Sequence, residues 1–160
     1  MSGKTDLAKI KFIRKVVNKW RKILHLDPIW TISIELADVD VMGGAFARVD
    51  TSNSEYYVAV MEINAAIFTS EEEEFVFLIN EIVCHELVHL VMIDFVHSAQ
   101  VAAGDNESMH DELRYKYEQF TSRLQKAFMG LDDLITSLQE EAMKAGQELA
   151  SVDDGKEKAE

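Results

Sequence analysis

The residues with the clearest chemical potential are His85-Glu86-Leu87-Val88-His89, two histidines four positions apart with a glutamate directly after the first. On an α-helix, positions i and i+4 lie on one face, so both imidazoles can reach a single metal ion. The glutamate follows about 100° around the helix, where its carboxylate can deprotonate a water molecule beside that metal. The spacing therefore predicts a zinc site with His85 and His89 as ligands and Glu86 as the general base.

The surrounding sequence indicates that this motif lies on a buried helix. Apolar residues from Phe75 to Val96 cover nearly the whole circumference of a helix, which is typical of a central core helix. This stretch is long enough to span a membrane, but its charged and imidazole side chains argue against a transmembrane helix. Without partners, these polar groups would cost several kcal/mol in a core, so we favour a metal site over hydrogen-bonded core histidines. The polar residues are Glu81, His85, Glu86, His89 and Asp94.

The rest of the chain predicts an α+β fold. An amphipathic helix is expected over about 6–25, and residues 30–36 then alternate between apolar and polar, as in a half-buried strand. Two further strands, over about 45–49 and 56–63, are separated by turn residues and predict an antiparallel hairpin. A further helix is expected over 107–129. Together these elements predict a small antiparallel or mixed sheet of three to four strands with an N-terminal helix, a central motif-bearing helix and a following C-terminal helix.

The C-terminal part of the chain has a weaker pattern. Gly130 interrupts the helical periodicity, so residues 1–130 are expected to form one domain. An apolar stripe from Leu131 to Leu149 predicts a last helix over 131–150, which packs back or forms a homodimer. The charged residues 151–160 are expected to be a disordered acidic tail.

The charge distribution narrows the range of partners. The net charge of −13 repels phosphate backbones and anionic lipids, so we expect neither a nucleic-acid partner nor a membrane. Half of the 16 basic residues lie between Lys4 and Lys22, and a basic helix there can dock on an acidic body. The N-terminus shows no signal-peptide pattern and the single cysteine, Cys84, forms no internal disulfide, so we expect a cytoplasmic protein.

The motif and its context resemble the zincin metallopeptidases. The HExxH residues on a helix behind a small mixed sheet carry the resemblance, which covers about Trp30 to Phe128. The short chain resembles the minimal metallopeptidases of phages and mobile elements. The resemblance implies zinc-dependent peptide hydrolysis, an extended substrate at a sheet edge and a third ligand downstream. The metzincin pattern is not met, because Met92 and Phe95 stand where it requires glycine and histidine, and His97 falls two residues late.

A glutamate ligand on the next helix would make the site similar to those of gluzincins. Two local patterns compete for this role. Residues 106–111 resemble the NExxxD pattern of thermolysin-like enzymes, with Glu107 as the ligand. Residues 118–124 resemble the glutamate-plus-apolar signature of the anti-repressor type of mobile-element metallopeptidase. The full set of candidates for the third ligand is His97, Glu107, His110, Glu112 and Glu118.

Helix lengths favour Glu118 as the third ligand. No glycine or proline follows the motif before Gly104, so the motif helix is expected to run at least to Val96, about 13 Å beyond the motif. An antiparallel helix that starts near Glu107 must return about nine residues to reach the metal, and Glu118 is near that level. The predicted ligands of one zinc ion per chain are therefore His85, His89 and Glu118, with Glu107 and His110 as alternatives to Glu118.

The predicted function is that of a zinc metallopeptidase, in which water held between zinc and Glu86 cleaves a bond of a peptide or protein substrate. Glu81 is a candidate to orient His85, and Asp111 would do so in the register of Glu107. The alternative is a zinc-binding regulatory or interaction module without proteolytic activity. Candidates by type for the group that stabilises the oxyanion are His110, Arg114, Tyr115 and Tyr117.

Overall fold

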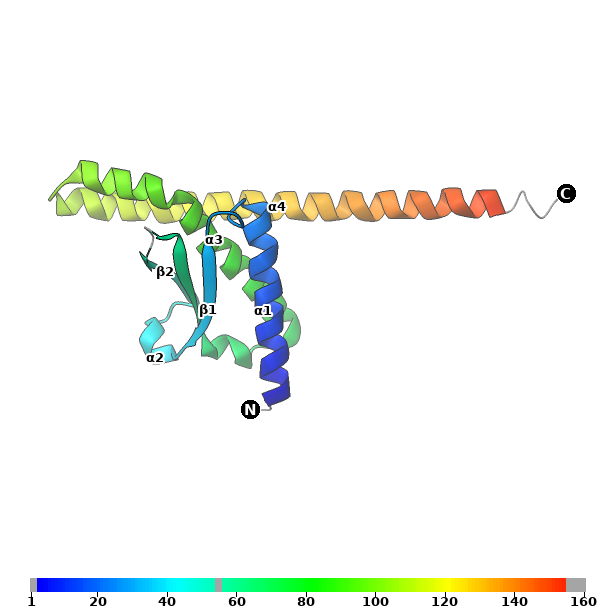
Figure 1. Cartoon of the computed structure of the whole chain (residues 1–160), viewed down its shortest axis with the longest axis horizontal. Coiled ribbons are helices and arrows are strands. Elements are labelled where there is room, and N and C mark those ends of the chain that lie inside the picture. Colours follow the sequence, from blue (N-terminus) through cyan, green and yellow to red (C-terminus); the bar gives the residue numbers. More distant parts are fainter. Residues whose placement is uncertain (1–2, 54–55, 155–160) are drawn as a thin grey trace. The chain divides into compact units, whose positions relative to one another are not determined.

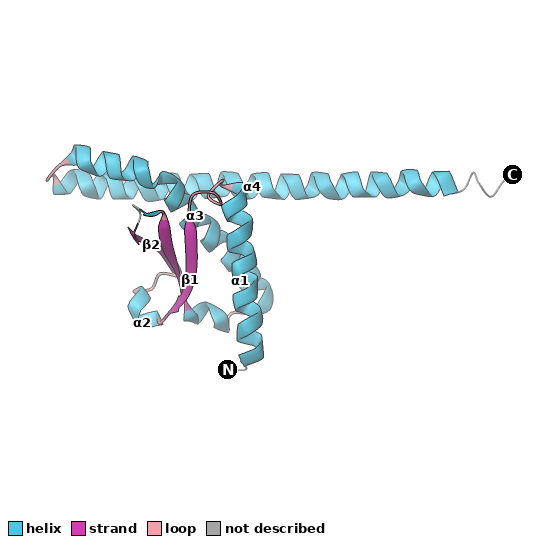
Figure 2. Ribbon diagram, in the orientation of Figure 1, coloured by secondary structure: helices cyan, strands magenta, loops and turns pink. Residues whose placement is uncertain are grey.

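The computed structural model describes residues 3–53 and 56–154. The chain divides into two compact units, residues 1–125 and 126–160. The first unit is α+β, as predicted, with helices and a three-stranded sheet (Figures 1 and 2). Its elements are α1 (Gly3–Ile23), β1 (Thr31–Ala37), α2 (Val39–Met42), β2 (Ala47–Asn53), β3 (Val58–Asn64), η2 (Ala65–Thr69), α3 (Glu72–Ala103) and the first part of α4 (Glu107–Asp154).

The sheet is mixed and has the order β1-β3-β2. The predicted hairpin is confirmed, because β2 pairs antiparallel with β3, with Val49 opposite Met61. Strand β1 pairs parallel with β3, with Ile34 opposite Met61. The parallel pairing leaves β2 at one edge of this sheet, with a row of backbone groups that no strand of the sheet covers.

The core of the first unit lies between the sheet and two helices. Alternate residues of β3, namely Ala59, Met61 and Ile63, are buried, as the period of two in a strand requires. Helix α1 contacts α3, and α3 contacts β2. The indole Nε1 of the fully buried Trp20 donates a hydrogen bond of 3.0 Å to Asn80 Oδ1, which joins α1 to α3.

The burial of helix α3 changes along its length. Its buried residues all lie between Phe75 and Leu90, whereas Phe95 and Val101 are 67% and 68% exposed. In the described part of the chain, α3 is the one helix that is long and apolar enough to cross a membrane, judged by length and composition alone. The buried stretch from Phe75 to Leu90 supplies seven residues to the core of the first unit.

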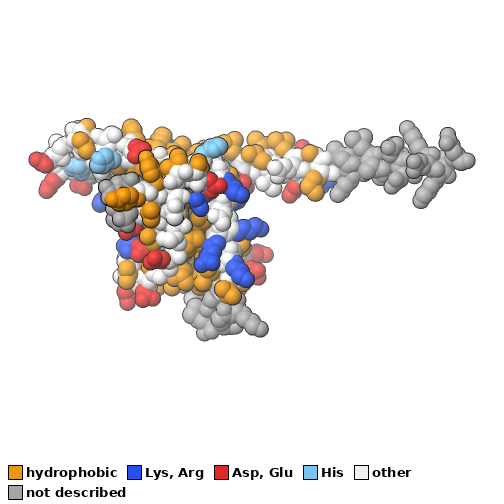
Figure 3. Space-filling view, in the orientation of Figure 1, with side chains coloured by type: hydrophobic (Ala, Val, Ile, Leu, Met, Phe, Trp, Pro, Cys, Tyr) orange, Lys and Arg blue, Asp and Glu red, His pale blue; other side chains and the backbone are white. Residues whose placement is uncertain are grey.

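The basic side chains of α1 gather on one side of the first unit (Figure 3). Lys9 Nζ donates hydrogen bonds to the backbone carbonyls of Phe68 and Ser70, at 2.8 and 3.1 Å. Arg21 donates one of 2.7 Å to the carbonyl of Trp30. These cations of α1 therefore bind carbonyl oxygens at the ends of other elements, which ties the helix to the sheet and to α3.

Helix α4 continues through Gly130, so the predicted break at that glycine is wrong. A glycine inside a helix costs about 1 kcal/mol, which the remaining residues of a long helix outweigh. Residues 151–154 also belong to the helix rather than to a disordered tail, and 155–160 lie outside the described residues. In the second unit, four apolar residues of the predicted stripe are exposed, namely Leu131, Leu134, Ile135 and Leu138. The homodimer through this stripe stays a prediction.

Candidate metal centre

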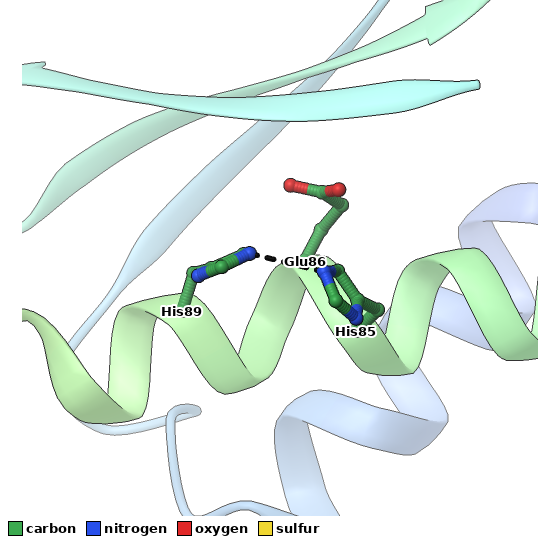
Figure 4. A group of neighbouring side chains, drawn as sticks. All are labelled: His85, Glu86 and His89. Carbon is green, nitrogen blue, oxygen red and sulfur yellow. Dashed lines mark hydrogen bonds between the residues drawn. The ribbon is translucent and has the colours of Figure 1, made fainter. Parts of the chain in front are cut away.

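His85, Glu86 and His89 come together on the inner part of α3. One potential ligand atom from each residue lies within 4.8 Å of the others, close enough to hold a metal ion. The Nε2 atoms of His85 and His89 are 3.2 Å apart. Glu86 points from the helix towards the strands, on a different side from the facing imidazoles (Figure 4). The motif therefore separates two ligand nitrogens from a carboxylate, as the helical spacing predicts.

Glu118 of α4 reaches the same two imidazoles. Its Oε2 lies 3.5 Å from His85 Nε2 and 3.8 Å from His89 Nε2. Ligand atoms bound at 2.0–2.1 Å to one tetrahedral ion lie roughly 3.3 Å apart, which is close to all three separations here. Two imidazoles and a carboxylate are also a donor set that suits zinc. The residues present therefore fit a zinc ion, and the assignment of Glu118 as its ligand stays a prediction.

The other candidates for the third ligand lie elsewhere. Glu107 is the first residue of α4, at the far end from the motif. His110 Nε2 donates a hydrogen bond of 2.7 Å to the carbonyl of Gly104, which closes the turn between the helices. His97 lines the wall of the cleft described below. Glu118 is the candidate that the antiparallel course of α3 and α4 brings to both histidines.

Gln125 orients His85, a role for which the sequence offered Glu81 and Asp111 as candidates. Gln125 Nε2 donates a hydrogen bond of 3.1 Å to the carbonyl of Glu81, so its Oε1 faces His85. That oxygen lies 3.2 Å from His85 Nδ1. Because an amide oxygen only accepts, Nδ1 must carry the proton and Nε2 keeps its lone pair. Glu81 thus contributes through its backbone carbonyl, and the amide of Gln125 selects the imidazole tautomer that can bind a metal through Nε2.

Tyr117 supports the second histidine. Its hydroxyl donates a hydrogen bond of 3.2 Å to the backbone carbonyl of His89, and the two ring centres are 4.8 Å apart. Burial raises the pKa of Tyr117, and the carboxylates of Glu118 and Glu86 raise it further, so the phenol stays protonated at neutral pH. Burial lowers the pKa of His89, which favours the neutral imidazole that a metal requires.

The surroundings of Glu86 shift the pKa of its carboxyl. Burial raises the pKa of its carboxyl above the ordinary value, whereas His85 and the backbone amide of Val49 act in the opposite direction. A raised pKa brings a carboxylate closer to the pH at which it must accept and return a proton. The contact with Val49 also places this carboxylate beside β2, the edge strand of the sheet.

A cleft of about 910 Å³ is lined by the three motif residues together with side chains of β2 and α4. Strand β2 forms one wall with residues such as Arg48 and Val49, and α3 forms another with the motif residues and His97. Tyr117 and Glu118 of α4 complete the lining. The cleft therefore brings together an open strand edge, the carboxylate of Glu86 and the side chains of His85, His89 and Glu118.

Sequence reasoning missed Gln125 and Val49. Gln125 follows Glu118 by seven positions, about two helical turns, so the two side chains share a face of α4. That spacing is a usable signal for an orienting residue once Glu118 is chosen. The amide of Val49 carries no such signal, because any residue supplies a backbone N–H.

Comparison of the chain with protein-family models, with curated proteins and with solved structures found no match. Among the described residues, His85, Glu86 and His89 form a group of side chains that could hold a metal ion.

Proposed function

We propose that this protein is a zinc-dependent metallopeptidase of the zincin type, with His85, His89 and Glu118 as the metal ligands. The observation that carries the proposal is the set of three separations between ligand atoms, 3.2, 3.5 and 3.8 Å, beside a carboxylate directed away from them. A purely structural zinc site is usually closed by four protein ligands. Three ligands with a base at an open cleft favour catalysis over a structural role.

In the proposed reaction, each residue of the site has a separate role. A zinc ion held by the three ligands would supply the positive charge that acidifies water and polarises the carbonyl of a peptide bond. Glu86 accepts a proton from the attacking water and returns it to the amine that leaves. Gln125 keeps the lone pair of His85 on Nε2, and Tyr117 fixes the backbone at His89.

The edge of β2 offers a place for the substrate. An extended peptide can add to an open strand edge through backbone hydrogen bonds, and β2 forms a wall of the cleft. Its residue Val49 already contacts Glu86 through the backbone, so a peptide along this edge lies beside the base. The geometry therefore supports peptide hydrolysis more directly than chemistry on a small molecule.

The Glu86→Gln variant tests this function. Gln keeps the size of the side chain and removes the base, so we expect zinc content to stay unchanged and the hydrolysis of a peptide library to fall at least about 100-fold. The matched control is Glu112→Gln, an exposed glutamate of α4, which should retain full activity. Wild-type protein that binds zinc but cleaves no library peptide would favour the regulatory module instead.

A further inference from the structure

A second cleft in the first unit lies between the outer half of α3 and the first turns of α4. Its volume is about 790 Å³. The lining is mainly apolar, and two of its aromatic rings are accessible, since Phe95 is 67% and Phe120 is 46% exposed. We refer to it as the apolar groove. Its other apolar residues are Met92, Val96, Ala99 and Leu113.

Three cations border the apolar groove. Arg114, Lys116 and Arg123 are the only basic residues between positions 91 and 125, and all three line it. Within residues 3–53 and 56–154, none of them forms an ion pair or a side-chain hydrogen bond. By contrast, Arg48 pairs with Glu62 and Lys9 binds two carbonyls. In a protein with a net charge of −13, three unpaired cations around an apolar surface form a local site for carboxylates.

The apolar groove adjoins the cleft of the metal centre. Val96, Gln100, Tyr117 and Glu118 line both. Glu118 turns its carboxylate to the histidines, so it stands at the boundary between the two cavities. A peptide bound at the metal centre would therefore have the apolar groove directly beyond these shared residues.

We propose that the apolar groove binds a segment of the peptide substrate in which apolar side chains alternate with aspartate or glutamate. This inference rests on the proposed peptidase function, because it assigns the groove to the substrate of that site. The apolar side chains would contact Phe95 and Phe120, and the carboxylates would pair with the three cations. The face of α4 from Leu113 to Arg123 is about 15 Å long, which matches four or five residues of an extended peptide.

Charge makes this preference selective. The remainder of the protein is strongly acidic and repels an acidic peptide, so binding depends on the few cations beside the groove. A basic peptide would meet the opposite situation, with attraction over much of the surface and repulsion at the groove. Acidic peptides should therefore bind through this groove or not at all.

The test uses the full chain with Glu86→Gln, so that binding is measured without cleavage. The probes are fluorescein-labelled peptides of leucine, phenylalanine and glutamate, with matched peptides in which glutamine or lysine replaces glutamate. Fluorescence anisotropy should show the tightest binding for the glutamate peptide. Replacing the three cations together (Arg114→Gln, Lys116→Gln and Arg123→Gln) should weaken it about tenfold, as expected for three exposed ion pairs.

Two controls match these changes. Lys11→Gln, Arg14→Gln and Lys15→Gln together remove the same charge from the exposed face of α1 and should leave affinity within about twofold. Phe95→Ala should weaken binding several-fold, whereas Val101→Ala, equally exposed but outside the groove, should not. Because Phe95 and Val101 are exposed, neither change should unfold the protein.

The outcomes separate the two proposals. Equal binding of the glutamate and glutamine peptides, or equal effects of the groove and α1 variants, would overturn the assignment of the groove. A change in oligomeric state of the groove variants without a change in peptide affinity would also overturn it and identify a second copy as the occupant. Wild-type protein that binds the acidic peptide through the groove but hydrolyses nothing would support the groove and overturn the peptidase.

Discussion

The two halves of α3 share an apolar sequence but have different surroundings. Residues 72–90 contain every buried side chain of the helix and contact the sheet and α1, and two polar side chains there have partners on other helices. Asn80 binds Trp20, and His85 binds Gln125. Residues 91–103 contain no buried side chain, and they expose Phe95 and Val101.

The two proposals assign different roles to the two halves of α3. Reactive side chains need fixed geometry, which the packed half provides through buried neighbours and oriented hydrogen bonds. A binding surface needs accessible apolar area, which the outer half provides. Glu118 lies where the two halves meet, since it contacts both histidines and lines both cavities.

The strongest test of the comparison replaces one apolar residue in each half. Ile79→Ala removes a fully buried side chain and should lower the free energy of unfolding by about 2–5 kcal/mol. Val91→Ala, at a side chain that is 44% exposed, should change it by less than about 0.5 kcal/mol. Urea denaturation followed by circular dichroism measures both. Similar losses for the two variants would show that the outer half is also packed.

Gln125→Leu should act on the metal centre rather than on the fold. Without the amide oxygen, His85 is no longer held with the proton on Nδ1, and loss of such a partner typically weakens metal affinity about 10- to 100-fold. Competition with a zinc chelator measures the affinity, and nitrogen-15 NMR of the metal-free protein reports the tautomer of His85.

The matched control for this change is Gln119→Leu, because the amide of Gln119 binds the exposed Tyr115 hydroxyl instead. It should leave both measurements unchanged. An unaltered tautomer and affinity in Gln125→Leu would show that packing alone orients His85.

Asn80→Ala tests how much the hydrogen bond between α1 and α3 contributes to the stability of the packed half. It leaves the indole N–H of the buried Trp20 without an acceptor, which should cost about 1–2 kcal/mol of stability. Asn18→Ala, at an exposed position of α1, is the control and should cost much less. Thermal unfolding with tryptophan fluorescence follows the change. A loss no larger than that of the control would mean that the hydrogen bond between α1 and α3 contributes little.

The smallest expected effect concerns pH. The pKa of Glu86 is raised in the folded protein, so the folded state binds protons more readily than the unfolded state. The resulting stability is present at low pH and is lost as the pH rises through the folded pKa. In chelator-treated protein, Glu86→Gln should therefore raise stability at neutral pH and not below about pH 4. A gain that is equal at both pH values would contradict burial of the charge.

The sequence predicted the fold class and much of the placement of the candidate residues. Helical spacing alone places His85 and His89 on one face, and the count of about nine residues for the return of α4 points to Glu118. The parallel pairing of β1 was left open, because strand alternation does not identify a partner. The predicted break at Gly130 was wrong, because the cost of one glycine in a helix is smaller than the helix propensity of the many residues around it.

The most direct test of the central claim is the zinc content per chain, measured by elemental analysis on untagged protein after zinc reconstitution and dialysis. We expect about one zinc in the wild type, none in His85→Ala and weakened retention in Glu118→Ala. His110→Ala is the control and should retain zinc, because this histidine binds the Gly104 carbonyl. Wild-type protein without zinc, or equal zinc in all four proteins, would contradict the metal centre.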